Sequence, residues 1–213
     1  MAAIKMVKTL PEGIVDHPHL RDATELDLSG SKLVSLPERF GQLENLRTLN
    51  LESCRSLGSL PEGFGELRSL TSLNLSGDMF NPMKLESLPE GFGELTNLRT
   101  LDLRWCRSLV SLPEGFGELT NLHTLNLEYC PLGSLPEGFG ELKHLQTLNL
   151  GGCWELISLP ERFGKLENLE NLDLGYCVSL RSLSEGFGEL QKLEKLDSSP
   201  AQPSAHCPNG SES

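Results

Sequence analysis

The most regular feature of this chain is a pattern of leucines that returns every 23 or 24 residues over most of its length. Over residues 46–51 leucines alternate with polar residues, which is the period-two pattern of a strand buried on one face. The chain then passes Cys54 and two more leucines before it returns through Pro61–Leu67, with the sequence PEGFGEL. Each copy therefore predicts one short strand and one return segment, and successive copies predict strands stacked side by side.

Copies of this pattern cover most of the 213 residues. Full copies begin at Leu46, Leu70, Leu98, Leu122, Leu145 and Leu169, a truncated copy at Leu193 and a degenerate one at Ala23. The copy that begins at Leu70 carries four extra residues around MFNPMK. A single copy cannot bury enough apolar surface to offset the conformational entropy lost on ordering it, so the copies are expected to fold only as a stack.

The pattern divides the chain into three parts. Residues 1–22 are interpreted as a degenerate N-terminal coil that acts as a cap, and residues 23–196 as a solenoid of about seven coils. Residues 197–213 are rich in Pro and Ser and are predicted to be a disordered polar tail. No amphipathic capping element follows the last coil. Either the chain is a fragment of a longer protein, or the uncovered C-terminal coil docks or dimerises, and the oligomeric state stays open.

The return segment is the most constant part of each copy. Pro61 fixes φ just after the last strand leucine, while Gly63 and Gly65 permit a tight backbone. Glu62 and Glu66 fall at solvent positions, and we interpret such glutamates as a solvated back face rather than a functional acidic surface. Seven of the eight phenylalanines share one slot and are expected to form a packing spine: Phe40, Phe64, Phe92, Phe116, Phe139, Phe163 and Phe187.

Five of the six cysteines also follow the repeat, whereas Cys207 lies in the tail. They are predicted to form a structural ladder, one per coil: Cys54, Cys106, Cys130, Cys153 and Cys177. The shared period argues against paired disulfides, and a small buried thiol with a weak S–H donor suits a slot where the strand turns outward. In two other copies, Ser31 and Asp78 are expected to fill this slot. A redox or zinc site is the less favoured alternative.

Charge and hydropathy exclude several classes of protein. The formal net charge of −12 argues against a nucleic-acid partner, because phosphate binding needs a basic face. The start, MAAIKMVKTLPEG, has no apolar h-region, and no apolar run is long enough to cross a bilayer. We therefore expect no secretory signal, no membrane insertion and a cytoplasmic location.

No catalytic constellation is present in the sequence. The motifs G-x-S-x-G, H-E-x-x-H and C-x-x-C do not occur, and the recurring G-F-G lacks the lysine of a phosphate-binding loop. His17 and His19 stand two residues apart in a Pro-containing turn, which favours a solvated turn over a metal site. The chain is predicted not to be an enzyme and to carry no cofactor and no metal.

The variable part of each copy carries the candidate binding residues. All four Trp and Tyr residues fall at or beside the end of the strand: Trp105, Tyr129 and Tyr176 precede the slot cysteine, and Trp154 follows it. Aromatic and Arg side chains are enriched in binding hot spots. A partner-binding stripe on the concave face is predicted to comprise Arg99, Arg104, Trp105, Arg107, His123, Tyr129, Trp154 and Tyr176. The alternative is that these aromatics merely pack on neighbouring coils.

Small polar residues line the inner strand positions and are interpreted as a solubility feature, with no affinity assigned to them. They include Thr48, Asn50, Thr100, Asp102, Thr124, Asn126, Thr147 and Asn149.

The spacing L-x-x-L-x-L-x-x-N/C-x-L matches the leucine-rich repeat. The fuller pattern, with its LP-x-x-[FI]-G-x-L return segment at Leu60–Leu67 and Leu112–Leu119, resembles the cytoplasmic repeats of plant disease-resistance proteins and of plant or algal Ras-suppressor-like proteins. This resemblance implies an α/β solenoid of horseshoe type, with a parallel concave β-sheet and irregular, 3-10 or short helical return segments on the convex side. It also implies a non-enzymatic recognition or scaffolding role. Unlike the resistance proteins, this chain has no nucleotide-binding region.

Two functions follow as hypotheses. The first is a protein–protein interaction scaffold in intracellular signalling that binds an unidentified partner on its concave face. The second is a small-ligand sensor or regulatory subunit, with a pocket between the aromatic residues of adjacent coils: Trp105, Tyr129 and Trp154.

Overall fold

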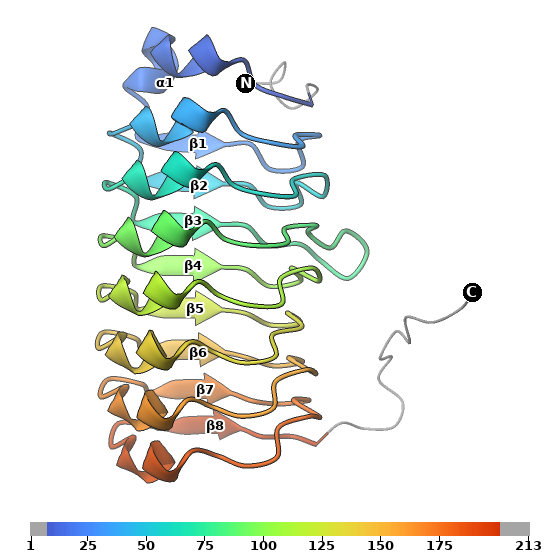
Figure 1. The fold of residues 1–213 in the computed structure, drawn as a ribbon, viewed down its shortest axis with the longest axis vertical. Coiled ribbons are helices and arrows are strands. Elements are labelled where there is room, and N and C mark those ends of the chain that lie inside the picture. Colours follow the sequence, from blue (N-terminus) through green and yellow to red (C-terminus); the bar gives the residue numbers. More distant parts are fainter. Residues whose placement is uncertain (1–7, 201–213) are drawn as a thin grey trace, which may run out of the picture.

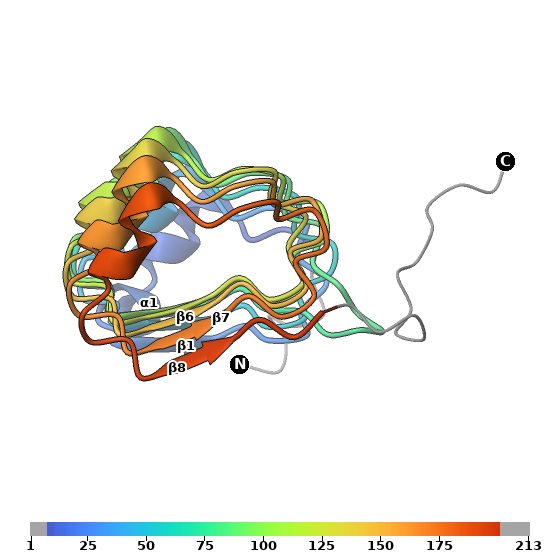
Figure 2. The ribbon, with the colours of Figure 1, turned by 90° about the horizontal axis from the view of Figure 1, so that it is seen from below.

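The structure is a computed structural model that describes residues 8–200. Residues 1–7 of the predicted cap and residues 201–213 of the predicted tail, with Cys207, lie outside this part. Figure 1 shows coils stacked in chain order, with all strands on one side and the short helices on the other. Seen along the stack in Figure 2, the coils nearly superimpose.

Eight short strands form one parallel sheet in the order of the sequence. They are β1 (Glu25–Asp27), β2 (Thr48–Asn50), β3 (Ser72–Asn74), β4 (Thr100–Asp102), β5 (Thr124–Asn126), β6 (Thr147–Asn149), β7 (Asn171–Asp173) and β8 (Lys195–Asp197). In every pair the central leucines lie opposite each other, as Leu49 does with Leu73. The central leucine of β1–β7 is buried and its two neighbours point outward, so the sheet has one core face and one outer sheet face.

The return segments are 3-10 helices of five residues. They are η2 (Glu12–Asp16), η3 (Glu38–Gln42), η4 (Glu62–Glu66), η5 (Glu90–Glu94), η6 (Glu114–Glu118), η7 (Glu137–Glu141), η8 (Glu161–Lys165) and η9 (Glu185–Glu189), and one α-helical turn, α1 (Pro18–Arg21), follows η2. Pro61 precedes η4 with φ of −66°, the fixed value that leads the chain out of the strand side. The predicted solenoid, with its parallel sheet and 3-10 return segments, is confirmed.

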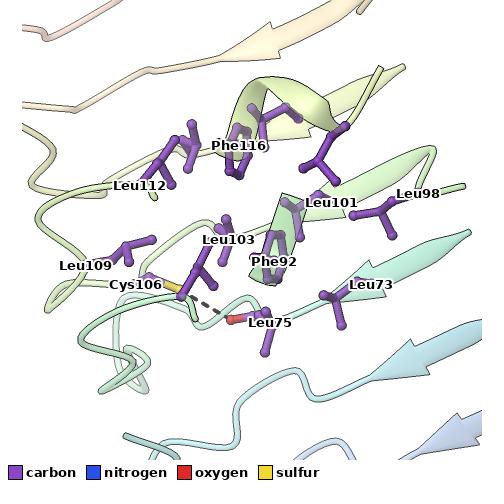
Figure 3. Packing of buried hydrophobic residues seen from close by; sticks show 14 of the residues in the cluster. Leu73, Leu75, Phe92, Leu98, Leu101, Leu103, Cys106, Leu109, Leu112 and Phe116 are labelled. Atoms are coloured by element: carbon purple, nitrogen blue, oxygen red, sulfur yellow. Dashed lines mark hydrogen bonds between the residues drawn. The ribbon is translucent and has the colours of Figure 1, made fainter. Parts of the chain in front are cut away.

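The core lies between the sheet and the 3-10 helices. The phenylalanines of successive return segments stack with ring centroids 6.1–6.3 Å apart and planes within 4° of parallel. Six of them, from Phe40 to Phe163, are at most 1% exposed. Figure 3 shows Phe92 and Phe116 against the leucines of the adjoining strands. These rings form the predicted spine.

Neighbouring 3-10 helices approach each other backbone to backbone. A Cβ atom added to Gly65 would lie 2.0 Å from the carbonyl oxygen of Gly91 in the next coil. No side chain fits such a gap, which explains why the second glycine of PEGFGEL recurs.

The two ends of the array differ. Leu10 and Val15, before the first strand, are buried and belong to the core cluster. In the last coil Leu183 and Leu196 are each 44% exposed, and Phe187 is only partly buried. The C-terminal end of the described array therefore presents apolar side chains to solvent.

Candidate functional site

The backbone turns sharply where each strand leaves the sheet. The residue before the slot has positive φ in six coils: Gly30, Ser53, Trp105, Tyr129, Gly152 and Tyr176, with φ between 57° and 68°. Glycine adopts this left-handed conformation readily, but any residue with a Cβ pays about 1–2 kcal/mol for it. Three bulky aromatics are therefore held where the backbone favours glycine. Strain of this kind is concentrated at functional positions in proteins.

Two of these aromatics form a continuous stack with an arginine. The rings of Trp105 and Tyr129 lie 4.1 Å apart between centroids and are tilted by 24°. The guanidinium of Arg107 lies 4.8 Å from the centroid of the Trp105 ring, within the range of a cation–π contact. On the other side the Tyr129 ring covers Gly152, where an added Cβ would meet Tyr129 Cδ1 at 2.6 Å. Arg107, Trp105 and Tyr129 are named the aromatic stack below.

The other predicted binding residues are spread over several coils. Arg99 is exposed just before β4, and His123 Nδ1 lies 2.6 Å from the carbonyl oxygen of Asn121. Trp154 is half-buried, and its backbone N–H donates to Gly152. Tyr176 is 40% exposed near the C-terminal end. The structure thus brings Trp105, Tyr129 and Arg107 into contact, while Arg99, His123, Trp154 and Tyr176 lie at separate positions along the stack of coils.

Charge on the outer sheet face is mixed. Arg104 pairs with Asp102 at 3.3 Å, yet burial raises the pKa of the Asp102 carboxyl above its usual value. Burial, and then the nearby charge of Asp173, raise the pKa of Glu128. Burial, and then the nearby charge of Glu128, also raise the pKa of Tyr129. The cations of the predicted partner-binding stripe are therefore interleaved with carboxylates.

The Asp or Asn that ends each strand has a structural role that the sequence interpretation missed. Its side-chain oxygen accepts the backbone N–H two residues on, at 2.8–3.1 Å, in all eight strands. These residues are Asp27, Asn50, Asn74, Asp102, Asn126, Asn149, Asp173 and Asp197. Such Asx turns fold the chain out of the sheet. The restriction of one strand position to Asp and Asn was the available signal.

The cysteine ladder lies inside the coils. Each thiol donates to the carbonyl of the leucine that directly follows the strand of the preceding coil, at 3.1–3.5 Å, and Figure 3 shows this bond from Cys106 to Leu75. Burial raises the pKa of Cys130 and Cys153 well above the usual value, and that of Cys177 to about 11. Thiols this reluctant to ionise are poor nucleophiles and poor metal ligands.

The prediction that Asp78 fills this slot in the third coil is wrong. Met83 pairs with Cys106 in a parallel bridge and is 1% exposed, whereas Asp78 is only half-buried at the start of the insertion. The slot has an apolar surrounding, so a methionine fits it better than a carboxylate. Ser31 does fill it in the first coil, where its hydroxyl lies 3.1 Å from the Cys54 sulfur.

Within residues 8–200, no group of three or more His, Cys, Asp or Glu side chains is arranged to hold a metal ion. In the same part of the chain, no helix is long and apolar enough to span a bilayer.

Comparisons with known proteins agree with this geometry. A family model described as a leucine-rich repeat region matches residues 111–209, a second described as leucine rich repeat matches residues 21–80, and a third of the same description matches residues 97–119. No curated protein matches the sequence.

Solved structures of similar shape include the leucine-rich repeat domain of the type III effector XopL. The two share 24% sequence identity with a TM-score of 0.67, over 90% of this chain and 73% of that one. A leucine-rich repeat protein of Leptospira interrogans has 24% identity and a TM-score of 0.48, over 90% of this chain and 69% of that one. At this identity the first likeness concerns the fold.

Proposed function

This chain is a leucine-rich repeat protein, and on that premise we propose that it is a non-enzymatic scaffold that binds a protein partner through its outer sheet face in intracellular signalling. Leucine-rich repeat arrays generally act as protein–protein interaction scaffolds, since a solenoid offers an extended surface built from many similar coils. The partner-binding face is proposed from the contacts described below. The signalling role is proposed from the resemblance to intracellular repeat proteins, and the cytoplasmic location from that resemblance and the expected lack of a secretory signal.

The observation that carries the proposal is the aromatic stack at the left-handed turns. Ser53 and Gly152 show that the fold accepts small residues at the same turn, so the coil does not require Trp105 or Tyr129 there. Both rings are only half-buried, and they hold each other and Arg107 in place. A rigid, partly exposed aromatic surface loses little entropy on binding, which is why such surfaces dominate interface energies.

The contacts of the stack favour a protein over a small ligand. Rings 4.1 Å apart are in direct contact, so no ligand fits between Trp105 and Tyr129 unless they separate. The stack presents a half-buried aromatic surface beside side chains of mixed charge, which is suited to contact with a protein surface. The small-ligand alternative therefore has no preformed cavity at these two rings.

The test compares capture by the wild type with capture by the double variant Trp105→Gly/Tyr129→Gly. Glycine suits the left-handed turn, so the variant removes the rings without adding strain. The matched control is Ser53→Gly, which makes the same backbone change at a turn without an aromatic. Circular dichroism and thermal unfolding establish that all three chains are folded.

We expect the wild type and Ser53→Gly to capture the same protein from a native extract of the source cells, and the double variant to lose it. The captured protein, once purified, should protect several adjacent strands from hydrogen exchange. Equal capture by the double variant contradicts a binding role for the stack. Protection confined to one pocket favours the small-ligand alternative.

A further inference from the structure

One coil departs from the repeat by a projecting loop. Between β3 and β4, residues 78–82 form a loop, and Met83 then occupies the slot, as its bridge to Cys106 shows. In Figures 1 and 2 this loop extends beyond the corresponding turns of the other coils. The neighbouring coils close without such a loop, so the fold does not need it.

The tip of the loop exposes two large apolar side chains. Phe80 is 83% exposed and Met79 is 57% exposed. Every other phenylalanine of the chain lies in the spine, fully or partly buried. Leaving a phenylalanine in water forfeits about 1.5–3 kcal/mol of burial. Phe and Met are also enriched where proteins bind each other.

The loop is held in one shape by its own hydrogen bonds. Asp78 Oδ1 accepts the backbone N–H groups of Phe80 at 2.7 Å and Asn81 at 2.8 Å, and these bonds lower the pKa of the carboxyl. The backbones of Asp78 and Asn81 also bond each other in both directions, at 3.2 Å. At its base, the N–H of Met83 donates to the carbonyl of Trp105 at 3.0 Å. The apolar tip is therefore presented on a fixed support that joins the aromatic stack.

Cations flank the loop on both sides. Arg55, in the preceding coil, is close enough to lower the pKa of Asp78 by its charge. Lys84 follows the loop and is exposed, and Arg107 lies on the Trp105 ring in the next coil. Asp78 uses its carboxylate on the loop itself, as described above. On a chain of net charge −12, this edge is an apolar tip with a positive rim.

We propose that the loop docks an acidic amphipathic segment of a partner protein, with apolar side chains packed on Met79 and Phe80 and carboxylates on Arg55, Lys84 and Arg107. The charge complementarity selects such a segment over a basic or neutral one. The rigid loop lowers the entropy cost of docking, and the flexible thioether of Met79 adapts to different apolar side chains. This inference adds a second contact site to the proposed scaffold, and it can be tested separately from the aromatic stack.

The probe is a displayed library of random peptides, selected on the full chain. Selected peptides should be richer in Asp, Glu and apolar residues than the unselected library. Phe80→Ser should weaken their binding by about tenfold or more, as expected for an anchor residue. Ile157→Ser is the matched control, because Ile157 is 51% exposed and lies three coils further along the stack. Higher ionic strength should also weaken binding, because it screens the cation rim.

A second variant tests the fixed support. Asp78→Ala leaves Phe80 in place but removes the two side-chain bonds to the N–H groups of Phe80 and Asn81, which loosens the loop, so it should weaken the same peptides by several-fold. The proposal is overturned if the library yields no binders, if binders tolerate Phe80→Ser as well as Ile157→Ser, or if they are not acidic. Peptides that still bind Trp105→Gly/Tyr129→Gly but not Phe80→Ser support the loop site even if the aromatic stack has no partner.

Discussion

The return segments and the turns at the strand ends belong to the same coils, yet their sequences vary in opposite ways. The return segment repeats as PEGFGEL because its core residues contact the return segment of the next coil: Phe64 stacks on Phe92, and Gly65 lies against the Gly91 carbonyl. The turn demands only a positive φ, which glycine, serine and aromatic residues all meet at different cost. Contact between neighbouring return segments thus keeps their sequence the same from coil to coil. At the turn only the backbone conformation is fixed, so the side chain can vary and is free for binding.

The largest expected effect is the difference in stability lost when a buried and an exposed phenylalanine are each replaced by alanine. Phe92→Ala should lower the free energy of unfolding by about 3–5 kcal/mol, because it leaves a cavity between two stacked rings. Phe80→Ala should change it by less than about 0.5 kcal/mol, because that side chain is exposed. Urea denaturation followed by circular dichroism measures both. Equal losses would mean that the loop contributes to the core.

The backbone contact between return segments gives the next largest effect. Gly65→Ala should cost about 1–3 kcal/mol, since its Cβ would overlap a carbonyl that cannot move without shifting a neighbouring coil. Gly133→Ala is the control, because nothing lies within 4 Å of its added Cβ and its φ is not left-handed. That variant should be neutral or more stable by about 0.4–1 kcal/mol. A tolerated Gly65→Ala would show that the return segments are looser than described.

At the left-handed turn, a glycine variant should be more stable than an alanine variant, which reverses the usual order of stability. Trp105→Ala and Trp105→Gly both lose the contacts with Tyr129 and Arg107, but only alanine keeps the strain of a Cβ at φ of 60°. The glycine variant should therefore be the more stable by about 1–2 kcal/mol.

Val110 provides the opposite control, since it has no positive φ. There the alanine variant should be more stable than the glycine variant by about 0.5–1 kcal/mol. Thermal unfolding of the four chains gives both comparisons. The same order at both sites would mean that Trp105 is not strained.

The repeat made the fold predictable. Period-two leucines, the phenylalanine slot and the cysteine spacing each appear many times. An irregular copy can therefore be interpreted by aligning it with the others. The prediction failed where a copy was unique: in the third coil Asp78 was placed in the slot that Met83 fills. A short insertion shifts the frame, and only the pairing with the next coil shows where the chain returns.

The candidate site was only partly predictable. The positions of Trp105 and Tyr129 could be identified because Trp and Tyr are rare in this chain, whereas the left-handed backbone at these positions was not predicted. Side-chain partners could not be found in the same way. The stacking of Tyr129 over Gly152 depends on ring orientation, and the hydrogen bonds inside residues 78–82 depend on a loop with no second copy.

The smallest expected effect concerns Asp102, at the position where four of the other strands, β2, β3, β5 and β6, carry asparagine. Burial raises the pKa of its carboxyl in the folded chain, so the ionised form is less favourable folded than unfolded. The penalty is absent below the usual pKa and grows as pH rises through the raised one. Asp102→Asn keeps the oxygen that accepts the Arg104 N–H, as Asn126 does for Glu128, and loses one partly exposed ion pair. At neutral pH it should therefore stabilise the chain by less than about 1 kcal/mol, because loss of the ion pair offsets part of the gain.

Below the usual carboxyl pKa this gain should vanish, because Asp102 is then neutral in both states. Urea denaturation of both chains at several pH values gives the comparison. A gain that persists in acid would place the cause in packing, and a loss at neutral pH would mean that the pair with Arg104 outweighs burial. Either result would change which charged side chains of the outer sheet face are expected to bind a partner. A carboxylate that is paired within its own coil contributes little to recognition.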